Sequence, residues 1–399
     1  MSNVISNFYI HVIFFKNNIY LRNKRNNKYK LEMRFGLATG AILIINAAMS
    51  MSVFGFAFQR QNSLFVRHHN VKSVIRRYLS SSNSAVGDQI LPEFVNKNNR
   101  DDQVFSALSA CGGIKVTVAT TRNIVNDLMI MHTMNPVPAD ALARAITCTL
   151  LVSNGMQDEQ TLQVTIQGDG ALRGIFAVST GSGKVRGYVG NSQVNNIPLQ
   201  EAVGRGSVQV VKMHPDWSTP YNGITAIRNG SIDIDIGCYL AESEQRSCAL
   251  ASATSMKGIL CTSAGGYLVE QLPSCDKESI EKVERNLARV VKKDGGSAVP
   301  SNLLLEGVTP YEIASQLLEG MDMKPLGQIS PEITCKCNEE RLIRSVRLIP
   351  KEEVDQILKE HGQIEARCEF CSKIYRIDAD RINNILNTAT DDPSLYKDL

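Results

Sequence analysis

The sequence lacks the residue patterns from which most catalytic sites are built. It contains only six histidines, and His132, His214 and His361 stand too far apart to form the HExxH pattern of a catalytic zinc site. The glycines at 168–170 lack dinucleotide-binding spacing, and residues 181–185 lack the Ser or Thr that follows lysine in a phosphate-binding loop. We therefore expect no catalytic residues, no bound nucleotide cofactor and no enzymatic activity.

Acidic residues are almost absent from the first 85 residues, which contain 12 Lys or Arg and a single acid, Glu32. The rest of the chain has 31 basic and 39 acidic residues, a net charge near −8. Nucleic-acid binding depends largely on basic groups that neutralise phosphates. The sequence therefore predicts no specific nucleic-acid partner.

The basic N-terminal segment is typical of a targeting leader, residues 1–85, that is removed from the mature protein. Its uncharged stretch, Phe35 to Gln59, is long enough for a membrane-spanning helix but rich in Gly, Ala and Ser, so we expect no stable membrane span after processing. Phe54 to Phe58 resembles the bipartite leaders of plastid proteins in algae with complex plastids, which favours the plastid stroma. Arg76 to Ser80 resembles a matrix-protease site, so the mitochondrial matrix is the alternative. Met33 is an alternative start.

The middle of the chain predicts an α+β core domain over residues 86–275. Leu162, Val164 and Ile166 alternate with polar residues, which indicates a half-buried strand. Ile175 to Ser179 and Val185 to Val189 flank a glycine-rich turn and predict a hairpin. Ala139 to Leu151 predicts a helix, so helices should pack on an antiparallel sheet.

Residues 276–330 predict a helical linker that follows this core. Ile280, Val283, Leu287 and Val290 recur at helical spacing among charged residues, which predicts an amphipathic helix packed on the core. A second helix is expected from Thr309 to Leu318. The dense charge beside a modest apolar face fits an element of marginal stability, although a plain connecting helical pair would show the same pattern.

Four cysteines near the C-terminus form the strongest chemical signal in the chain. Cys335 and Cys337 form a CxC pair, and Cys368 and Cys371 form a CxxC pair 30 residues later. Four thiolates in two short knuckles can close a tetrahedral site, for which one Zn²⁺ is the default occupant. Such a site can be a structural staple. It can also be a redox switch, because each knuckle places its two sulfurs close enough to form Cys335–Cys337 and Cys368–Cys371 disulfides and so release the metal.

The cysteine spacing resembles the zinc centre of the redox-regulated Hsp33 chaperones, and other motifs occur in that family's order. Those motifs span about residues 100 to 385, which makes the resemblance more specific than one cysteine pattern. They are Gly168–Gly170 with Gly174, Val185–Val189, Ala202–Gly206, Pro220–Gly223, Tyr239–Gln245, Ala264–Val269 and Cys335–Arg341.

The resemblance implies a holding chaperone that binds unfolded client proteins without ATP after oxidation has released zinc. It also implies that the linker loosens on activation, that residues 331–385 form the zinc-binding switch domain ahead of a tail at 386–399, and that the oxidised protein dimerises. Two rival functions remain open. A zinc-ribbon adaptor that binds RNA or protein would keep its metal under oxidation, and a thiol-disulfide oxidoreductase would use the CxxC pair in turnover.

The remaining charged and sulfur-bearing residues predict less. Basic side chains near the knuckles could offset the negative charge of a zinc tetrathiolate or simply form a solvated face: Lys336, Arg341, Arg344, Arg367, Lys373 and Arg376. The other six cysteines follow no ligand spacing and are expected to be buried free thiols: Cys111, Cys148, Cys238, Cys248, Cys261 and Cys275. An auxiliary disulfide at Cys275 is a weak alternative.

Overall fold

The computed structural model describes residues 12–15, 18–21, 101–273, 275–293, 301–346 and 349–382. It falls into two units, residues 1–67 and 68–399, which are described separately. In the first unit, β1 (Val12–Phe15) and β2 (Asn18–Leu21) form an antiparallel hairpin. The rest of the predicted leader, residues 86–100 and the predicted tail lie outside the described residues. Among the helices that are described, none has both the length and the apolar character needed to cross a membrane.

The second unit contains a five-stranded antiparallel sheet in the order β10-β11-β4-β3-β12. Its strands come from three separate parts of the chain. The third part, which contributes β12, lies beyond the core domain that the sequence predicted. They are β3 (Val104–Leu108), β4 (Ile114–Thr120), β10 (Cys248–Lys257), β11 (Leu260–Gln271) and β12 (Lys324–Ile329).

A six-stranded sheet has the order β13-β7-β6-β5-β8-β9, in which only the β13–β7 pair is parallel. The predicted strand and hairpin are confirmed as β5, β6 and β7, since their alternating apolar residues face a shared core. The strands are β5 (Thr161–Gly168), β6 (Ile175–Thr180), β7 (Lys184–Val189), β8 (Gly206–Met213), β9 (Tyr221–Ala226) and β13 (Glu332–Ile333).

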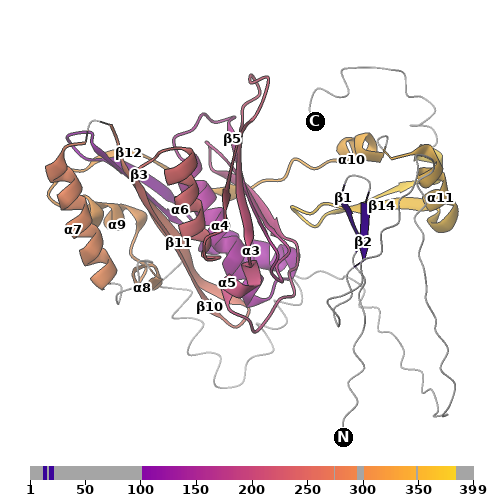
Figure 1. Ribbon diagram of the computed structural model, residues 1–399, viewed down its shortest axis with the longest axis horizontal. Coiled ribbons are helices and arrows are strands. Elements are labelled where there is room, and N and C mark those ends of the chain that lie inside the picture. Colours follow the sequence, from indigo (N-terminus) through magenta and orange to yellow (C-terminus); the bar gives the residue numbers. More distant parts are fainter. Residues whose placement is uncertain are drawn as a thin grey trace, which may run out of the picture. The chain divides into compact units, whose positions relative to one another are not determined.

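Helix α4 (Pro136–Ser153) lies between the two sheets and fills the core (Figure 1). It begins with proline at its first turn, where no backbone donor is needed, and 14 of its 18 residues are buried. A Cβ on Gly187 of β7 would lie 2.9 Å from side-chain atoms of Leu142 and Ile146, so glycine lets this strand approach the helix. Three shorter helices complete the core: α3 (Arg122–His132), α5 (Leu199–Val203) and α6 (Ile232–Ser243).

The linker lies on the outer face of the five-stranded sheet. Its helices are α7 (Lys277–Lys293), α8 (Ser301–Leu305) and α9 (Pro310–Leu317), which confirms the two predicted helical stretches. Residues 276–330 are not wholly helical, however, because their last part forms β12 and joins the sheet beside β3. Most of β12 is exposed, including Lys324 and Leu326, so its residues do not show the apolar alternation by which a half-buried strand is predicted.

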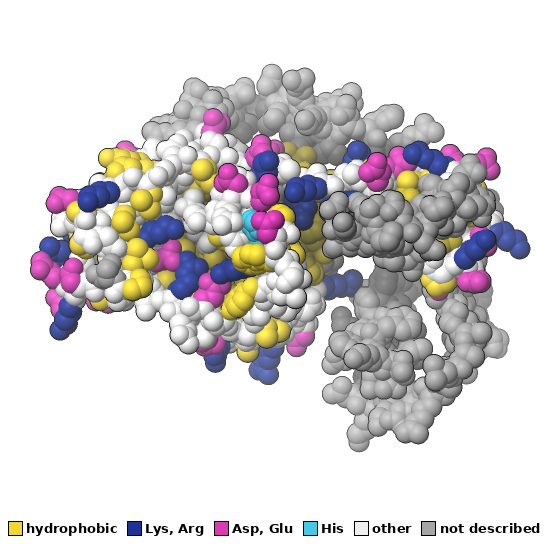
Figure 2. Space-filling model, turned by 90° about the horizontal axis from the view of Figure 1, so that it is seen from above, with side chains coloured by type: hydrophobic (Ala, Val, Ile, Leu, Met, Phe, Trp, Pro, Cys, Tyr) yellow, Lys and Arg dark blue, Asp and Glu magenta, His cyan; other side chains and the backbone are white. Residues whose placement is uncertain are grey.

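Apolar and polar contacts together hold the linker on the sheet. Val283 and Val290 of α7 and Leu317 of α9 join one buried cluster with residues of β3, β4, β10 and β11. The buried amide of Asn286 donates hydrogen bonds to the carbonyl oxygens of Leu317 (3.0 Å) and Glu319 (2.9 Å). At the left of Figure 2, where α7 lies, acidic and basic side chains stand side by side on its solvent face.

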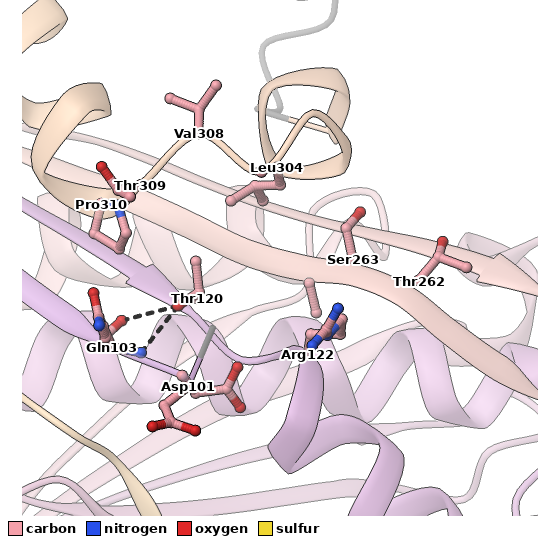
Figure 3. A pocket seen from close by; sticks show the side chains of 13 residues that line it. Asp101, Gln103, Thr120, Arg122, Thr262, Ser263, Leu304, Val308, Thr309 and Pro310 are labelled. Atoms are coloured by element: carbon pink, nitrogen blue, oxygen red, sulfur yellow. Dashed lines mark hydrogen bonds between the residues drawn. The ribbon is translucent and has the colours of Figure 1, made fainter. Parts of the chain in front are cut away.

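A small cavity of about 50 Å³ separates the α8–α9 loop from the sheet. Figure 3 shows Val308, Thr309 and Pro310 on its linker side and Thr120 and Arg122 on its core side. The mixed lining has room for ordered water. The linker is therefore less tightly packed at this loop than along α7 and α9.

The C-terminal module has its own small apolar cluster, which includes Val354, Leu358, Ile364 and Ile377. Helix α11 ends at Gly362, whose left-handed conformation (φ 70°) turns the chain into the following strand. The module consists of α10 (Glu339–Val346), α11 (Lys351–His361), β14 (Gln363–Arg367) and β15 (Ile374–Asp378).

The Asn286 amide generates the first prediction. Asn286→Ala should lower the free energy of unfolding by about 1–3 kcal/mol, because the buried Leu317 carbonyl oxygen and the partly buried Glu319 carbonyl oxygen lose their donor. Urea unfolding measures this loss, and hydrogen exchange should show faster opening of α7. Glu284→Ala, at an exposed position of the same helix, should change stability by less than about 0.5 kcal/mol. Equal unfolding midpoints for the two variants would contradict the role of the amide.

Candidate metal centre

Two short segments bring the four C-terminal cysteines together. Cys335 and Cys337 follow β13 and precede α10, and Cys368 and Cys371 occupy the turn between the paired strands β14 and β15. In that turn the Cys368 amide donates to the Lys373 carbonyl (2.9 Å) and the Ser372 amide donates to the Cys368 carbonyl (2.8 Å). Ser372 has φ 58°, which closes the turn tightly and directs both sulfurs toward the CxC segment.

The sulfur positions fit a tetrahedral ligand set. All four Sγ atoms lie within 4.8 Å of one another. Cys335 Sγ is 3.7 Å from Cys368 Sγ, and Cys337 Sγ is 3.3 Å from Cys371 Sγ. A tetrahedron with metal–sulfur bonds of about 2.3 Å has sulfur–sulfur edges of about 3.8 Å. The four cysteines could therefore bind one metal ion, and an all-sulfur set favours zinc among common metals.

Two short sulfur contacts join one knuckle to the other. Cys335 lies against Cys368, and Cys337 lies against Cys371. This arrangement is the one expected when both knuckles contribute edges to a single tetrahedron. The in-knuckle disulfides Cys335–Cys337 and Cys368–Cys371 stay a prediction about the oxidised protein.

Tyr375 supports the centre from β15, and the cysteine pattern alone did not reveal it. Its hydroxyl donates to the Cys337 carbonyl (3.0 Å) and to Cys337 Sγ (3.1 Å). Burial works against the Cys337 thiolate, but the hydrogen bond from Tyr375 and the contacts with the other three thiols outweigh it and lower the pKa of Cys337 to about 7. Burial raises the pKa of Cys335 and of Cys371.

The predicted basic residues mostly have partners other than the sulfurs. Arg376 pairs with Glu365 (2.7 Å), Arg367 donates to the Ser372 hydroxyl (2.9 Å), and Lys373 lies over the Tyr375 ring. Lys336 is exposed, and the side chain of Arg344 is not among those described. The interpretation as a solvated face therefore fits Arg376 and Lys336 better than a role in charge compensation.

The CxxC turn contacts the core through Phe370, which lies between the two cysteines, and through Ser372, which follows Cys371. Phe370 packs edge-on against Tyr188 of β7 (5.1 Å between centroids) and lies under the Arg186 guanidinium (4.7 Å). The Ser372 hydroxyl lies 3.2 Å from Nδ1 of His132 at the end of α3. Burial and the nearby positive charge of Arg367 lower the pKa of His132, which favours a neutral ring at this contact. The three histidines share no metal site among the described residues, but His132 belongs to this contact.

The six other cysteines are free thiols. Cys148 and Cys261 are buried, as expected, and burial raises the pKa of Cys261 to about 12. Cys238, Cys248 and Cys275 are partly buried. The expectation is wrong for Cys111, which is exposed because it lies in the tight turn between β3 and β4.

Comparisons with known proteins agree on one relationship. The family model described as Hsp33 protein matches residues 102–378. The 33 kDa chaperonin of Clostridioides difficile is 34% identical over 295 residues, which cover 71% of this chain and 98% of the relative. The 33 kDa chaperonin of Desulforamulus reducens is 31% identical over 297 residues, covering 71% and 97% of the two chains.

A solved structure shows the same fold. The crystal structure of the 33 kDa chaperonin from Thermotoga maritima superposes with a TM-score of 0.66 and covers 73% of this chain and all of that one. The sequence identity is 21%. The predicted α+β architecture, with a cysteine cluster near the C-terminus, is therefore confirmed.

The Tyr375 hydroxyl generates the second prediction. Tyr375→Phe should weaken Zn²⁺ binding by roughly 10- to 100-fold, the usual effect of losing a hydrogen bond to a metal ligand. Competition with a chelator measures the affinity. Tyr311→Phe, which removes an exposed hydroxyl on α9, is the matched control. Indistinguishable affinities for the two variants would mean that the hydrogen bond does not support a metal.

Proposed function

The chain belongs to the Hsp33 family of chaperones, and we propose that it is a holding chaperone, independent of ATP, that oxidation of a four-cysteine zinc centre activates. The reduced protein would be inactive. The observation that carries this proposal is the position of the linker. Its helices cover an apolar sheet face, and in the sequence the linker comes directly before the segment that contains the cysteine cluster.

The covered face is suited to binding unfolded protein. It contains Phe105, Val116, Val118, Tyr267 and Val269, all of which are buried beneath the linker. A contiguous apolar surface of this kind binds unfolded chains by burying their apolar side chains, with little dependence on sequence. Unfolded client proteins are therefore the proposed partners, and the surface is available only when the linker has left it.

The cysteine cluster is connected to the linker by a short piece of chain. β12 ends at Ile329, β13 consists of Glu332 and Ile333, and the first ligand candidate is Cys335. The Glu332 amide donates to the Gly183 carbonyl (3.1 Å) and the Thr334 amide donates to the Val185 carbonyl (2.9 Å), which pins this piece to β7. Loss of order around Cys335 would free β13, and through it the edge strand β12.

A bound zinc ion would keep the four sulfurs as thiolates, the form that peroxides attack. In each knuckle the two thiolates would lose two electrons and form one disulfide, while the oxygen–oxygen bond of the peroxide breaks and its oxygens take up two protons from solvent to give two molecules of water. A disulfide has no thiolate to donate. The Cys335–Cys337 and Cys368–Cys371 bonds would therefore remove the ligand set and the folding energy that depends on it.

The linker is held weakly enough to leave the sheet when the cysteine cluster is oxidised. Along α7 only Val283 and Val290 are buried apolar side chains, and its solvent face carries ion pairs that persist without the sheet. The cavity beneath the α8–α9 loop further reduces packing. An element with these features has a low free energy of local opening. We further propose that the oxidised protein dimerises and that the leader directs the chain to the plastid stroma, with the mitochondrial matrix as the alternative.

The third prediction tests the switch directly. Peroxide with mild heat should release zinc from the purified protein, and the same samples should then suppress aggregation of a denatured client. A metal-sensitive dye and light scattering follow the two events together. If zinc is retained and aggregation of the client is unchanged, the four cysteines form a structural zinc module or the protein is an adaptor.

A variant checks the ligands in the same assay. Cys335→Ser should prevent stable zinc binding, and Cys238→Ser, which changes a free cysteine in α6, should not. Sustained turnover in an insulin-reduction assay would favour an oxidoreductase over the chaperone.

The fourth prediction separates undocking of the linker from oxidation. Leu317→Asp places a charge in the buried cluster and should displace the linker, so the reduced protein should hold clients while it retains zinc. Ser315→Asp, on the exposed side of the same helix, should remain inactive. Circular dichroism should confirm that both sheets stay folded. An inactive, folded Leu317→Asp protein would contradict the covered face as the client site.

A further inference from the structure

Two cysteines outside the metal centre lie where the core meets the linker. Cys111 is in the turn between β3 and β4, and Cys275 directly precedes Asp276 and the first turn of α7. Cys111 is exposed and Cys275 is partly buried. These thiols are 164 positions apart in the sequence, so only the fold brings them to the same junction.

Cys275 packs directly on the β3–β4 turn. The Leu272 amide donates to the Gly113 carbonyl (2.8 Å), and the Cys275 amide donates to the Leu272 carbonyl (3.0 Å). A Cβ on Gly113 would lie 2.7 Å from the Cys275 Cα and 3.0 Å from its Sγ. Only glycine allows this approach, which places Cys275 over the turn that carries Cys111.

Cys111 reaches the first turn of α7 from the other side. Its Sγ lies 3.3 Å from the Ser279 hydroxyl and 3.2 Å from the Ser109 hydroxyl. Asp276 caps this turn, since its carboxylate accepts from the Ser279 amide (2.7 Å) and hydroxyl (3.0 Å). Both sulfurs therefore border the same capped turn.

The two thiols differ in exposure and in pKa, as expected of an attacking and a resolving cysteine. Hydrogen-bond contacts with Ser109 and Ser279 lower the pKa of Cys111, whereas burial, with the negative charges of Asp276 and of Cys111, raises the pKa of Cys275. An exposed thiol that ionises readily is the one that a peroxide attacks first. Cys111 is thus the attacking cysteine and Cys275 the resolving one.

We propose that Cys111 and Cys275 form a second redox site, which a peroxide converts into a disulfide at the junction of the core and α7. The Cys111 thiolate attacks one peroxide oxygen, the oxygen–oxygen bond breaks, and a sulfenic acid and one water form. The Cys275 sulfur then attacks the sulfenic sulfur, the sulfur–oxygen bond breaks, and a second water leaves. Together the two thiols lose two electrons and two protons. The bond requires the exposed Cys111 sulfur to leave the Ser109 and Ser279 hydroxyls and turn toward Cys275.

The Cys111–Cys275 disulfide would tether the start of α7 to the β3–β4 turn. It changes no ligand of the four-cysteine centre, so it can form whether or not that centre acts as a switch. The first turn of α7 would remain on the core even when the rest of the linker leaves it. The site therefore modifies the linker at the end opposite to the metal centre.

The fifth prediction concerns peptide mapping of the full-length chain after brief treatment with hydrogen peroxide. Cleavage after Lys and Arg gives the peptides Asp101–Lys115 and Gly258–Lys277, and a further cut after Glu270 separates Cys261 from Cys275. We expect Asp101–Lys115 linked to Gln271–Lys277, and loss of this product on reduction. Hydrogen exchange at the first turn of α7 should slow in the oxidised protein.

Variants decide whether the chemistry follows this route. In Cys275→Ser the linked peptide should disappear, and a sulfenic-acid probe such as dimedone should label Cys111 more strongly than in the unchanged protein. Cys238→Ser should leave the linked peptide unaltered. Any of three results would overturn the proposal. Cys111 stays reduced, or it forms a disulfide with Cys111 of a second chain or with a different cysteine, or it takes up equal label with and without Cys275.

Discussion

The outer face of the five-stranded sheet is an apolar surface that must be covered in water, and the rest of the structure depends on how this is done. The inner face packs on α4, whose small residues bring both sheets close to the helix. Among the described residues, the outer face is covered by α7, α8 and α9. If the linker is lightly held, as proposed, the outer face is the one surface of this core that could be exposed while α4 stays packed.

The metal centre can influence that cover because the chain between them is short and held by few bonds. β13 has two residues and forms the single parallel pair of its sheet. Phe370 and Ser372 add contacts with Tyr188 and His132 on the core side. In the proposed mechanism, the order of the cysteine knuckles and the docking of β12 and β13 belong to one arrangement, in which loss of the first would weaken the second.

Local patterns in the sequence predicted those elements whose own residues form a recognisable pattern. The alternation at Leu162, Val164 and Ile166 predicted β5, and the two cysteine pairs predicted the cluster. Contacts between distant segments left no such pattern. The hydrogen bond of Tyr375 to Cys337, the contact of Ser372 with His132 and the insertion of β12 beside β3 depend on tertiary packing.

The linker lies between two sets of thiols whose oxidation would act in opposite directions. Oxidation of the four-cysteine set would remove metal ligands and so, as proposed, loosen the end of the linker that contains β12. A bond between Cys111 and Cys275 adds a covalent tether at the start of α7. Because Cys111 is exposed and needs no metal to be released before it reacts, it would respond to peroxide independently of the zinc centre. Such a tether would keep the displaced linker near the sheet face and restrict how far α7 moves for as long as the disulfide persists.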